Sequence, residues 1–194
     1  MNLACPVKAL KRAYHHGDLR NALVAEALHL LEKSGTSDFT LRDLAKRVGV
    51  SYAAPYAHFE DKRALLVAVA AGAADKLTAA LLAGTQGKTD PVEEFLGMGQ
   101  AYVQFGLEHP ALYRLMFTAW ELTPEDKHKY PELEQASERC FKTLTDMLER
   151  QQKSGFLRPG MVEADALTIW SMVHGIAMLA IDGRIECATE HAPP

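Results

Sequence analysis

Cysteine is scarce in this sequence and never occurs in a ligand-like pattern. Cys5, Cys140 and Cys187 are odd in number and far apart, with no CxxC pair and no Cys/His ligand spacing. A disulfide framework is therefore not expected, and the thiols are predicted to be free in a reducing cytoplasm. Long hydrophobic runs are missing too, because no apolar stretch follows the early charges and no uncharged apolar segment of about 18 residues occurs. We expect neither a signal peptide nor a membrane-spanning helix.

Catalytic signatures are also missing. The sequence has no glycine-rich phosphate loop, no GxSxG and no HExxH motif. One carboxylate–histidine pair, Glu125 and His128, has the spacing used in metal-binding helix bundles, but it lies in a polar segment and has no second copy. A helical enzyme is therefore the weaker interpretation. Stoichiometric iron, manganese or zinc in the purified protein would support it. We expect no metal and no cofactor.

The charges that are present are divided unevenly along the chain. The 194 residues are 48% hydrophobic and 24% charged, with a formal net charge of −4, as in an ordinary soluble globular protein. Residues 1–63 nevertheless carry a net charge of +3, and the remainder carries −7. This division favours an amino-terminal part that contacts DNA and a carboxy-terminal part with another task.

Helical periodicity dominates the chain, and no useful length of β-alternation is present, so we predict an all-α fold. A loose basic arm is followed by amphipathic segments at about 18–34, 61–83, 91–108, 111–119, 132–153 and 162–182, with two short helices between about 40 and 59. The long helix that begins near Asp61 has no flexible linker before its end at about Ala83. It is therefore expected to join the two parts rigidly.

The first short helix has clear start and stop signals. Thr40 can cap its amino end, and Asp43 completes something close to a capping box. Gly49 follows the last apolar position, where a left-handed backbone ends a helix. The apolar face is formed by residues at i, i+3, i+4 and i+7, namely Leu41, Leu44, Ala45 and Val48.

The second short helix contains a proline at a position that does not suit a regular α-helix. Ser51 is its expected cap, which makes Pro55 the fourth helical residue, one place after the positions where a missing N–H is harmless. We therefore expect the helix to start late or to open with a tight, 3₁₀-like turn. Two short helices around a glycine turn are typical of a helix-turn-helix, which lays its second helix in the major groove of DNA.

Several groups of residues extend this pattern. They are Tyr14-His15-His16-Gly17-Asp18-Leu19-Arg20, Phe39-Thr40-Leu41-Arg42-Asp43-Leu44-Ala45, Gly49-Val50-Ser51 and Tyr56-x-His58-Phe59-x-x-Lys62. From about Tyr14 to Leu66 their order resembles the tetracycline-repressor (TetR) family of bacterial transcription regulators. Val173-His174-Gly175 after Trp170 is similar to the Trp-His-Gly type of carboxy-terminal domain in that family. An adaptor that binds only proteins would leave the motif from Tyr56 to Lys62 unexplained.

The resemblance implies a three-helix helix-turn-helix domain joined by a long helix to a larger helical domain for effector binding and dimerisation. We expect the arm at 1–13, the DNA-binding domain at 14–62 and the larger domain at 63–194. It implies a cytoplasmic homodimer, bound as one or two pairs to a near-palindromic double-stranded DNA operator. A small apolar or amphipathic effector would release a repressor of this kind by favouring one separation of the reading heads.

The residues expected to contact DNA lie on and around the second short helix. They are Thr40, Arg42, Ser51, Tyr52, Ala53, Pro55, Tyr56, His58 and Lys62. Tyr52 and Ala53 are expected at base edges, whereas Tyr56, His58 and Lys62 are expected at phosphates. The alternatives are core packing for Tyr56 and a merely solvated charge for Lys62. Few polar groups face the groove, so specificity is expected to depend on Tyr52, on Arg42, on the arm or on DNA shape.

The larger domain is rich in methionine and aromatic residues that could line an apolar cavity. The expected cavity residues are Met98, Tyr102, Phe105, Tyr113, Met116, Phe117, Trp120, Phe141 and Trp170. Ordinary core packing is the alternative for each of them. A dimer interface is expected on the last helix, where small residues let helices approach closely, at Trp170, His174, Gly175, Ala177 and Met178. For His174 we expect packing or a place in the dimer interface rather than ligand contact.

Overall fold

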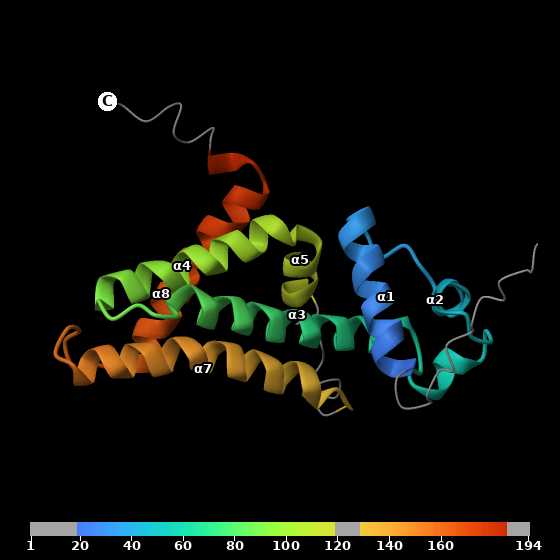
Figure 1. Cartoon of the computed structure of the whole chain (residues 1–194), viewed down its shortest axis with the longest axis horizontal. Helices are drawn as coiled ribbons and strands as arrows, with labels where there is room; N and C mark the ends of the chain where they lie inside the picture. Colours follow the sequence, from blue (N-terminus) through green and yellow to red (C-terminus); the bar gives the residue numbers. More distant parts are fainter. Residues whose placement is uncertain (1–18, 119–128, 186–194) are drawn as a thin grey trace, which may run out of the picture.

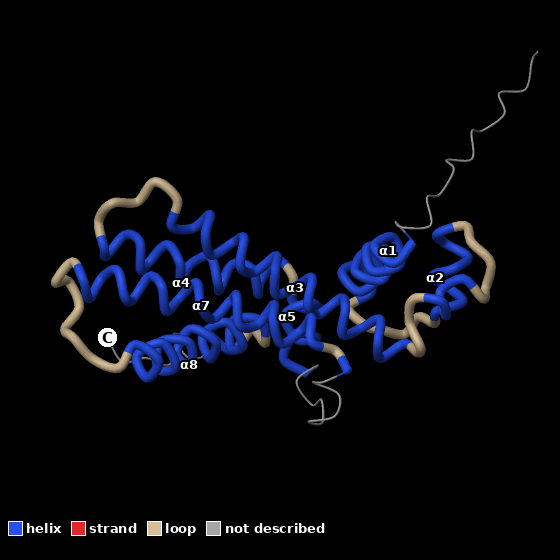
Figure 2. The backbone as a smooth tube through the Cα atoms, turned by 90° about the horizontal axis from the view of Figure 1, so that it is seen from below, coloured by secondary structure: helices blue, strands red, loops and turns tan. Residues whose placement is uncertain are grey.

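The fold is all-α, as predicted. A computed structural model describes residues 19–118 and 129–185, and within these ranges every regular element is a helix (Figures 1 and 2). The elements are α1 (Leu19–Ser34), α2 (Leu41–Val48), the 3₁₀ turn η1 (Ala54–Ala57), α3 (Lys62–Thr85), α4 (Pro91–Glu108), α5 (Pro110–Thr118), α7 (Pro131–Lys153) and α8 (Val162–Ile181). The predicted arm, Trp120, Glu125 and His128 lie outside the described residues.

The long helix α3 organises the molecule. Figure 1 shows α1, α2 and η1 gathered at one end of α3, while α4, α7 and α8 accompany its other end. Asp61 caps α3, because its carboxylate accepts a hydrogen bond from the backbone N–H of Ala64 at 2.8 Å. The helix continues without a break to Thr85, so it joins the helix-turn-helix to the larger bundle as one rigid element.

Two helices are long and apolar enough to cross a membrane by length and composition, α3 and α8. In α3 the apolar residues form the core, and 56% of the relevant window is buried in the fold. Its many alanines let α4 and α7 approach closely on either side. In α8 only 11% of the window is buried, so one subunit leaves much of this apolar helix uncovered.

The predicted capping box at the start of α2 is present. The Thr40 hydroxyl accepts a hydrogen bond from the Asp43 backbone N–H at 3.1 Å, and the Asp43 carboxylate accepts one from the Thr40 N–H at 2.9 Å. The side-chain hydrogen bond from Thr40 is the main cause that lowers the pKa of Asp43. Gly49 ends the helix with φ of 82°, in the left-handed region that glycine adopts without strain. Local sequence signals therefore define both ends of α2.

The second short helix is shorter than a helix-turn-helix pattern suggests. It is a single 3₁₀ turn, and the cap position is Ala53 rather than Ser51. The prediction that Ser51 caps with its side chain is wrong; its backbone carbonyl instead accepts the N–H of Ala54 at 3.0 Å. Pro55 explains the tight turn, because it lacks an N–H, while its carbonyl accepts bonds from His58 and Phe59. The 3₁₀-like turn that we expected at the start of this helix thus makes up the whole of η1.

Candidate nucleic-acid interface and effector cavity

The surface around η1 separates exposed from buried residues. The side chains of Tyr52 and Tyr56 are 59% and 51% exposed, and Ser51, Ala53 and His58 are also exposed. Bulky aromatic rings remain in water only at a cost in free energy, so an exposed pair of tyrosines suits a surface that later contacts a partner. Both rings belong to the turn that would enter a groove, which leaves core packing unsupported as the role of Tyr56.

Pro55 does not share this surface. It is fully buried, together with Phe59 at 3% exposure, and the two side chains hold the turn against α1 and α2. A base or phosphate cannot reach a buried pyrrolidine ring, so the prediction that Pro55 contacts DNA is wrong. Its role is to shape the backbone that presents its neighbours.

Arg42 and Thr40 lie at the start of α2, beside the same surface. The Arg42 side chain is exposed and makes no hydrogen bond or ion pair with any described residue. Thr40 is committed to the capping box, and its hydroxyl also lies 2.6 Å from the Asp43 carboxylate. Arg42 is therefore the cation at this edge that can pair with a phosphate without breaking a contact of the fold.

Lys62 has a role in the fold that its sequence position did not reveal. Its ammonium donates a hydrogen bond to the backbone carbonyl of Ser37 and lies 5.3 Å from the ring centre of Phe39. These contacts tie the first turn of α3 to the loop before α2. An ammonium group has three N–H donors, so a phosphate contact remains compatible with the bond to Ser37.

A large apolar cavity lies in the bundle formed by α3, α4, α7 and α8. Its volume is about 1190 Å³. Six of the nine predicted residues line it, namely Met98, Tyr102, Met116, Phe117, Phe141 and Trp170. Phe105 and Tyr113 are buried in the core and do not line it, so the prediction is wrong for these two. Trp120 lies outside the described residues.

Several cavity residues were not among those predicted from the sequence. On α7, Leu144 and Met147 continue the stripe that begins with Phe141, and Ile169 and Val173 do the same on α8. The spacing of three or four residues was a usable signal, because side chains at these intervals share one face of a helix. The preference for methionine and aromatic residues explains why the aliphatic Leu144, Ile169 and Val173 were not predicted, but not why Met147 was left out.

A buried polar cluster borders the cavity. The indole N–H of Trp170 donates to the Tyr102 hydroxyl at 3.0 Å, and Nδ1 of His174 lies 2.7 Å from the Tyr113 hydroxyl and 3.1 Å from that of Tyr102. Burial raises the pKa of Tyr102 to about 12, raises that of Tyr113 and lowers that of His174. All four groups are therefore uncharged near neutral pH, and the two hydroxyls, the indole N–H and Nδ1 of His174 have hydrogen-bond partners within the cluster.

The same cluster changes the assignment of the expected dimer interface. Trp170, His174 and Ala177 have the i, i+4, i+7 spacing of one helix face, and that face packs inward on the subunit's own α4 and α5. Ala177 is buried and Trp170 and His174 are half-buried within the subunit, so the exposed side of α8 is the better candidate and their place in an interface stays a prediction. Met178 is half-buried against the core, whereas a Cβ on Gly175 would meet nothing within 4 Å. The large apolar side chains that α8 exposes are Leu167, Met172, Ile176 and Leu179.

The described residues hold no cluster of three or more groups that could bind a metal ion. Cys140 is a half-buried free thiol that lines the cavity, and burial raises its pKa, so it is neither a thiolate ligand nor an activated nucleophile. The site that the structure presents is thus an exposed helix-turn-helix surface at one end and an apolar cavity at the other.

Comparison with known proteins agrees with both parts. Residues 23–69 match the family described as bacterial regulatory proteins of the tetR family, and residues 95–193 match the tetracyclin repressor-like C-terminal domain. Together the two matches cover most of the chain. The resemblance inferred from the sequence motifs is therefore confirmed.

Individual relatives give the same result. A solved structure of a protein of unknown function from Rhodococcus sp. RHA1 is 34% identical, with a TM-score of 0.79 over 94% of this chain and 91% of that one. The TetR family transcriptional regulator PfmR from Thermus thermophilus is 25% identical, with a TM-score of 0.58 over 80% and 84% of the two chains. The tetracycline repressor protein class C of Escherichia coli is 49% identical over 51 residues, or 26% of this chain, but only 23% of that relative's length is matched. The chain belongs to the TetR family of bacterial transcription regulators.

Proposed function

We propose that the protein is a repressor that binds a near-palindromic operator as a homodimer and is released by a small apolar or amphipathic effector. In this proposal residues 14–62 read DNA, helped by the basic arm at 1–13, and residues 63–194 bind the effector and form the dimer. The observation that carries it is the exposed surface of Tyr52 and Tyr56 beside the unpaired Arg42. Its place of action would be the cytoplasm, on the bacterial chromosome.

The exposed residues divide by the chemistry they can offer to DNA. Tyr52 and Ala53 suit base edges, because a hydroxyl can donate or accept and a methyl group can contact thymine. Arg42, Tyr56 and His58 suit phosphates, which fix the register of the protein on the duplex. Ser51, Thr40 and Lys62 complete the proposed set, and the buried Pro55 is omitted from it.

The proposed dimer interface uses the exposed face of α8. Its exposed apolar side chains Met172, Ile176 and Leu179 share one side of the helix, and Met172 and Ile176 also border the cavity, whereas Leu167 lies on another side. An exposed apolar helix face of this kind suits the interface of an obligate dimer. A two-fold axis through it would place two reading heads on the same side of the DNA, so that a near-palindromic site would match the symmetry of the protein.

Selection of DNA fragments tests the proposal directly. The purified protein is mixed with sheared genomic DNA of its source, and the retained fragments are sequenced and used in gel-shift titrations at several salt concentrations. We expect one recurring near-palindromic motif and an affinity that falls steeply with salt, as phosphate contacts require. Recovery of unrelated fragments, or an affinity that does not change with salt, would refute it.

Two variants assign the contact surface. Arg42→Ala should weaken binding to every fragment to a similar extent and reduce the slope of log affinity against log salt by about 1, the loss of one phosphate contact. Lys33→Ala removes an exposed cation from the carboxy-terminal turn of α1, away from the proposed surface, and serves as the matched control. Equal effects of the two variants would contradict the assignment.

Charged substitutions on α8 test the dimer. Met172→Glu with Ile176→Glu should convert a dimer to a monomer in sedimentation velocity, because two carboxylates would be buried without partners in the interface. Helical circular dichroism should be unchanged, since both side chains are exposed in the subunit. Arg158→Glu, in the exposed loop before α8, is the control, and a double variant that stays dimeric would show that the interface lies elsewhere.

A further inference from the structure

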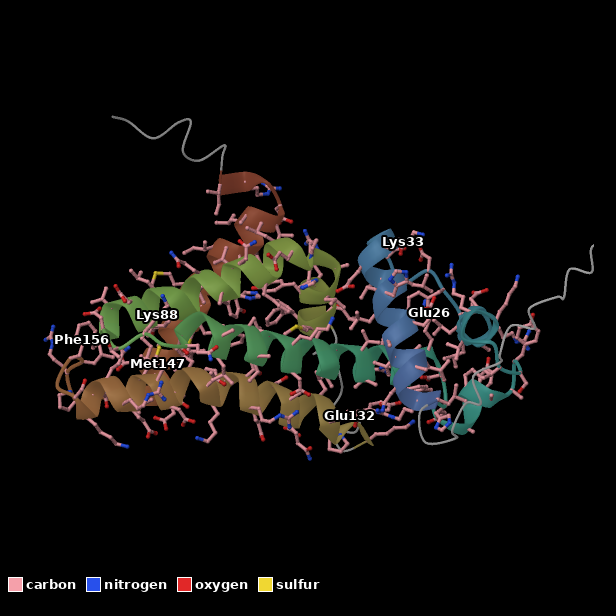
Figure 3. The ribbon with its side chains drawn as sticks, in the orientation of Figure 1. Glu26, Lys33, Lys88, Glu132, Met147 and Phe156 are labelled. Atoms are coloured by element: carbon pink, nitrogen blue, oxygen red, sulfur yellow. The ribbon has the colours of Figure 1, made fainter. Side chains whose placement is uncertain are left out.

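At the end of the cavity farthest from α1 and α2, one lysine, Lys88, lies in the loop between α3 and α4. Lys88 follows Gly87, whose φ of 75° turns the chain back, and its own N–H donates to the carbonyl of Thr85 at 3.2 Å. Lys88 lines the cavity with Gly97 of α4. Figure 3 shows Lys88 and Met147 at the end of the bundle remote from α1, and Glu132 at the near end.

The Lys88 side chain packs against the backbone of α4 at Gly97. A Cβ built on Gly97 would be 2.5 Å from Cε of Lys88, 3.0 Å from its Cδ and 2.3 Å from the carbonyl oxygen of Gly84. The close approach of the Gly84 carbonyl requires glycine at position 97, and the lysine stem lies across the same open site. The stem covers apolar surface, as lysine stems commonly do, and carries the ammonium to the rim of the cavity.

This ammonium has no counter-ion in the described part of the chain, where it makes neither a hydrogen bond nor an ion pair. The carboxylate of Glu94, on the first turn of α4, is already occupied. Arg150 donates to it at 2.6 Å, and the side-chain amide of Gln151 donates to it at 3.3 Å. The rim is therefore left with one positive charge beside walls that are almost entirely apolar.

The opposite end of the cavity carries the opposite charge. Glu134 and Glu138 line it from the first turns of α7, and about 20 Å of helix separates Glu134 from Met147. Glu134 has a local reason to be acidic, because carboxylates stabilise the amino end of a helix. Lys88 lies just beyond the last turn of α3, where a helix dipole likewise favours a cation, so its part in ligand binding is argued from its place at the cavity rim. The two glutamates would repel a second anion at their end.

The middle of the cavity offers no unsatisfied polar group from its aromatic cluster. The hydroxyl of Tyr102 is already engaged by Trp170, Tyr113 and His174. A ligand group placed there gains mainly from burial of apolar surface, at roughly 25 cal/mol per Å². The body of the ligand should therefore be hydrocarbon-like, with its polar group at one end.

We propose that the cavity binds an elongated amphipathic monoanion of the aliphatic carboxylate class. Its acidic group pairs with the Lys88 ammonium, and its apolar body runs along α3 and α7 toward Glu134. This assignment rests on the proposed function, because it names the chemical class of the effector. Glu134 and Glu138 disfavour dicarboxylates, and a cationic amphiphile would find no partner for its head group at the Lys88 end.

Calorimetric titration of the full-length protein without DNA tests the ligand class. The probes are laurate, lauryl alcohol and laurylammonium, which share one chain and differ in the charge of the head group. Laurate should bind about 10-fold more tightly than the alcohol, the equivalent of about 1.4 kcal/mol for a partly exposed ion pair. Laurylammonium should bind more weakly than laurate, and its affinity should depend on Glu134 and Glu138 and not on Lys88. Equal affinities, a preference for laurylammonium or no binding of any probe would overturn the proposal.

Variants of Lys88 tie the preference to this residue. Lys88→Met keeps an apolar stem across Gly97 and should abolish the preference for laurate over the alcohol, whereas Lys88→Arg should retain it. Lys33→Met is the surface control and should leave it unchanged. Dodecanedioate should bind the wild type more weakly than laurate, and Glu134→Gln with Glu138→Gln should reduce that difference. A preference for laurate that survives in Lys88→Met would refute the assigned role of the lysine.

The ligand class and the regulatory function can fail separately. Binding of laurate that depends on Lys88 supports the ligand class even when laurate does not release the DNA fragments selected above. In that case only the proposed release mechanism would fail. Conversely, DNA binding that is specific and salt-dependent supports the proposed function when laurate does not bind.

Discussion

Arg20 connects the DNA-binding helices to the cavity-bearing bundle. Its Nη2 lies 3.3 Å from Oε1 of Glu132, and its guanidinium carbon lies 5.4 Å from the ring centre of Phe59. Glu132 immediately precedes Leu133, which lines the cavity, and Phe59 is the second residue after η1. We propose that a shift of the first turn of α7 reaches the residues that hold the reading surface through this ion pair.

The first prediction concerns this ion pair. Glu132→Gln should change the free energy of unfolding by less than about 1 kcal/mol, because exposed pairs contribute little to stability. It should nevertheless move the ratio of DNA affinities without and with laurate toward unity, since α7 then no longer holds Arg20. Gel-shift titrations measure the ratio. Lys142→Gln breaks an exposed pair with Asp146 elsewhere on α7 and is the control; a ratio that responds equally in both variants would contradict the prediction.

The second prediction concerns the capping box of α2. Hydrogen bonds from Thr40 lower the folded-state pKa of Asp43 below its usual 3.8, so the ionised carboxylate stabilises the fold above that pH. This contribution is lost as the pH falls through the lowered pKa. Asp43→Ala should therefore reduce the melting temperature at pH 7, and the difference from wild type should narrow below pH 3.8. Asp38→Ala, at an exposed acid in the preceding loop, should show no such convergence in thermal unfolding.

The third prediction concerns the buried cluster around His174. Desolvation lowers the pKa of His174 below 6.5 in the folded state, so the unfolded chain binds the proton first as the pH falls. The stability that the neutral ring contributes is present above pH 6.5 and is lost progressively below it. His174→Gln cannot titrate and should flatten the stability profile between pH 7 and pH 5 in urea unfolding. His29→Gln, on the exposed side of α1, should keep the wild-type slope.

The fourth prediction compares two glycines of one helix. Gly97→Ala forces a Cβ to within 2.3 Å of the Gly84 carbonyl oxygen and should destabilise the protein by about 1–3 kcal/mol through overpacking. Gly99→Ala meets no atom within 4 Å and should stabilise α4 by up to about 1 kcal/mol through helix propensity. Chemical unfolding of both variants measures the difference. Similar changes of the same sign would refute the close packing of α3 on α4.

Local signals in the sequence predicted the helices well, because caps and periodicity act within a few residues. The Thr40–Asp43 box and the left-handed Gly49 formed as expected, and the long helix begins next to Asp61 as predicted. The same signals misjudged Ser51, since the conformation of Pro55 moved the start of the turn to Ala54. Base contacts stay a prediction, because the side chains around Tyr52 specify a DNA surface without specifying a DNA sequence.

The sequence by itself determined an all-α regulator of the TetR family with a helix-turn-helix near its amino end. Residue type and spacing are sufficient for that, because amphipathic periods and caps depend on neighbours along the chain. Only the tertiary structure decided which face of α8 is inward, that Pro55 is buried, and that Lys88 lies across Gly97 at the rim of the cavity. These facts depend on how distant helices pack, and a periodic pattern identifies an apolar face without saying whether its own subunit or another molecule covers it.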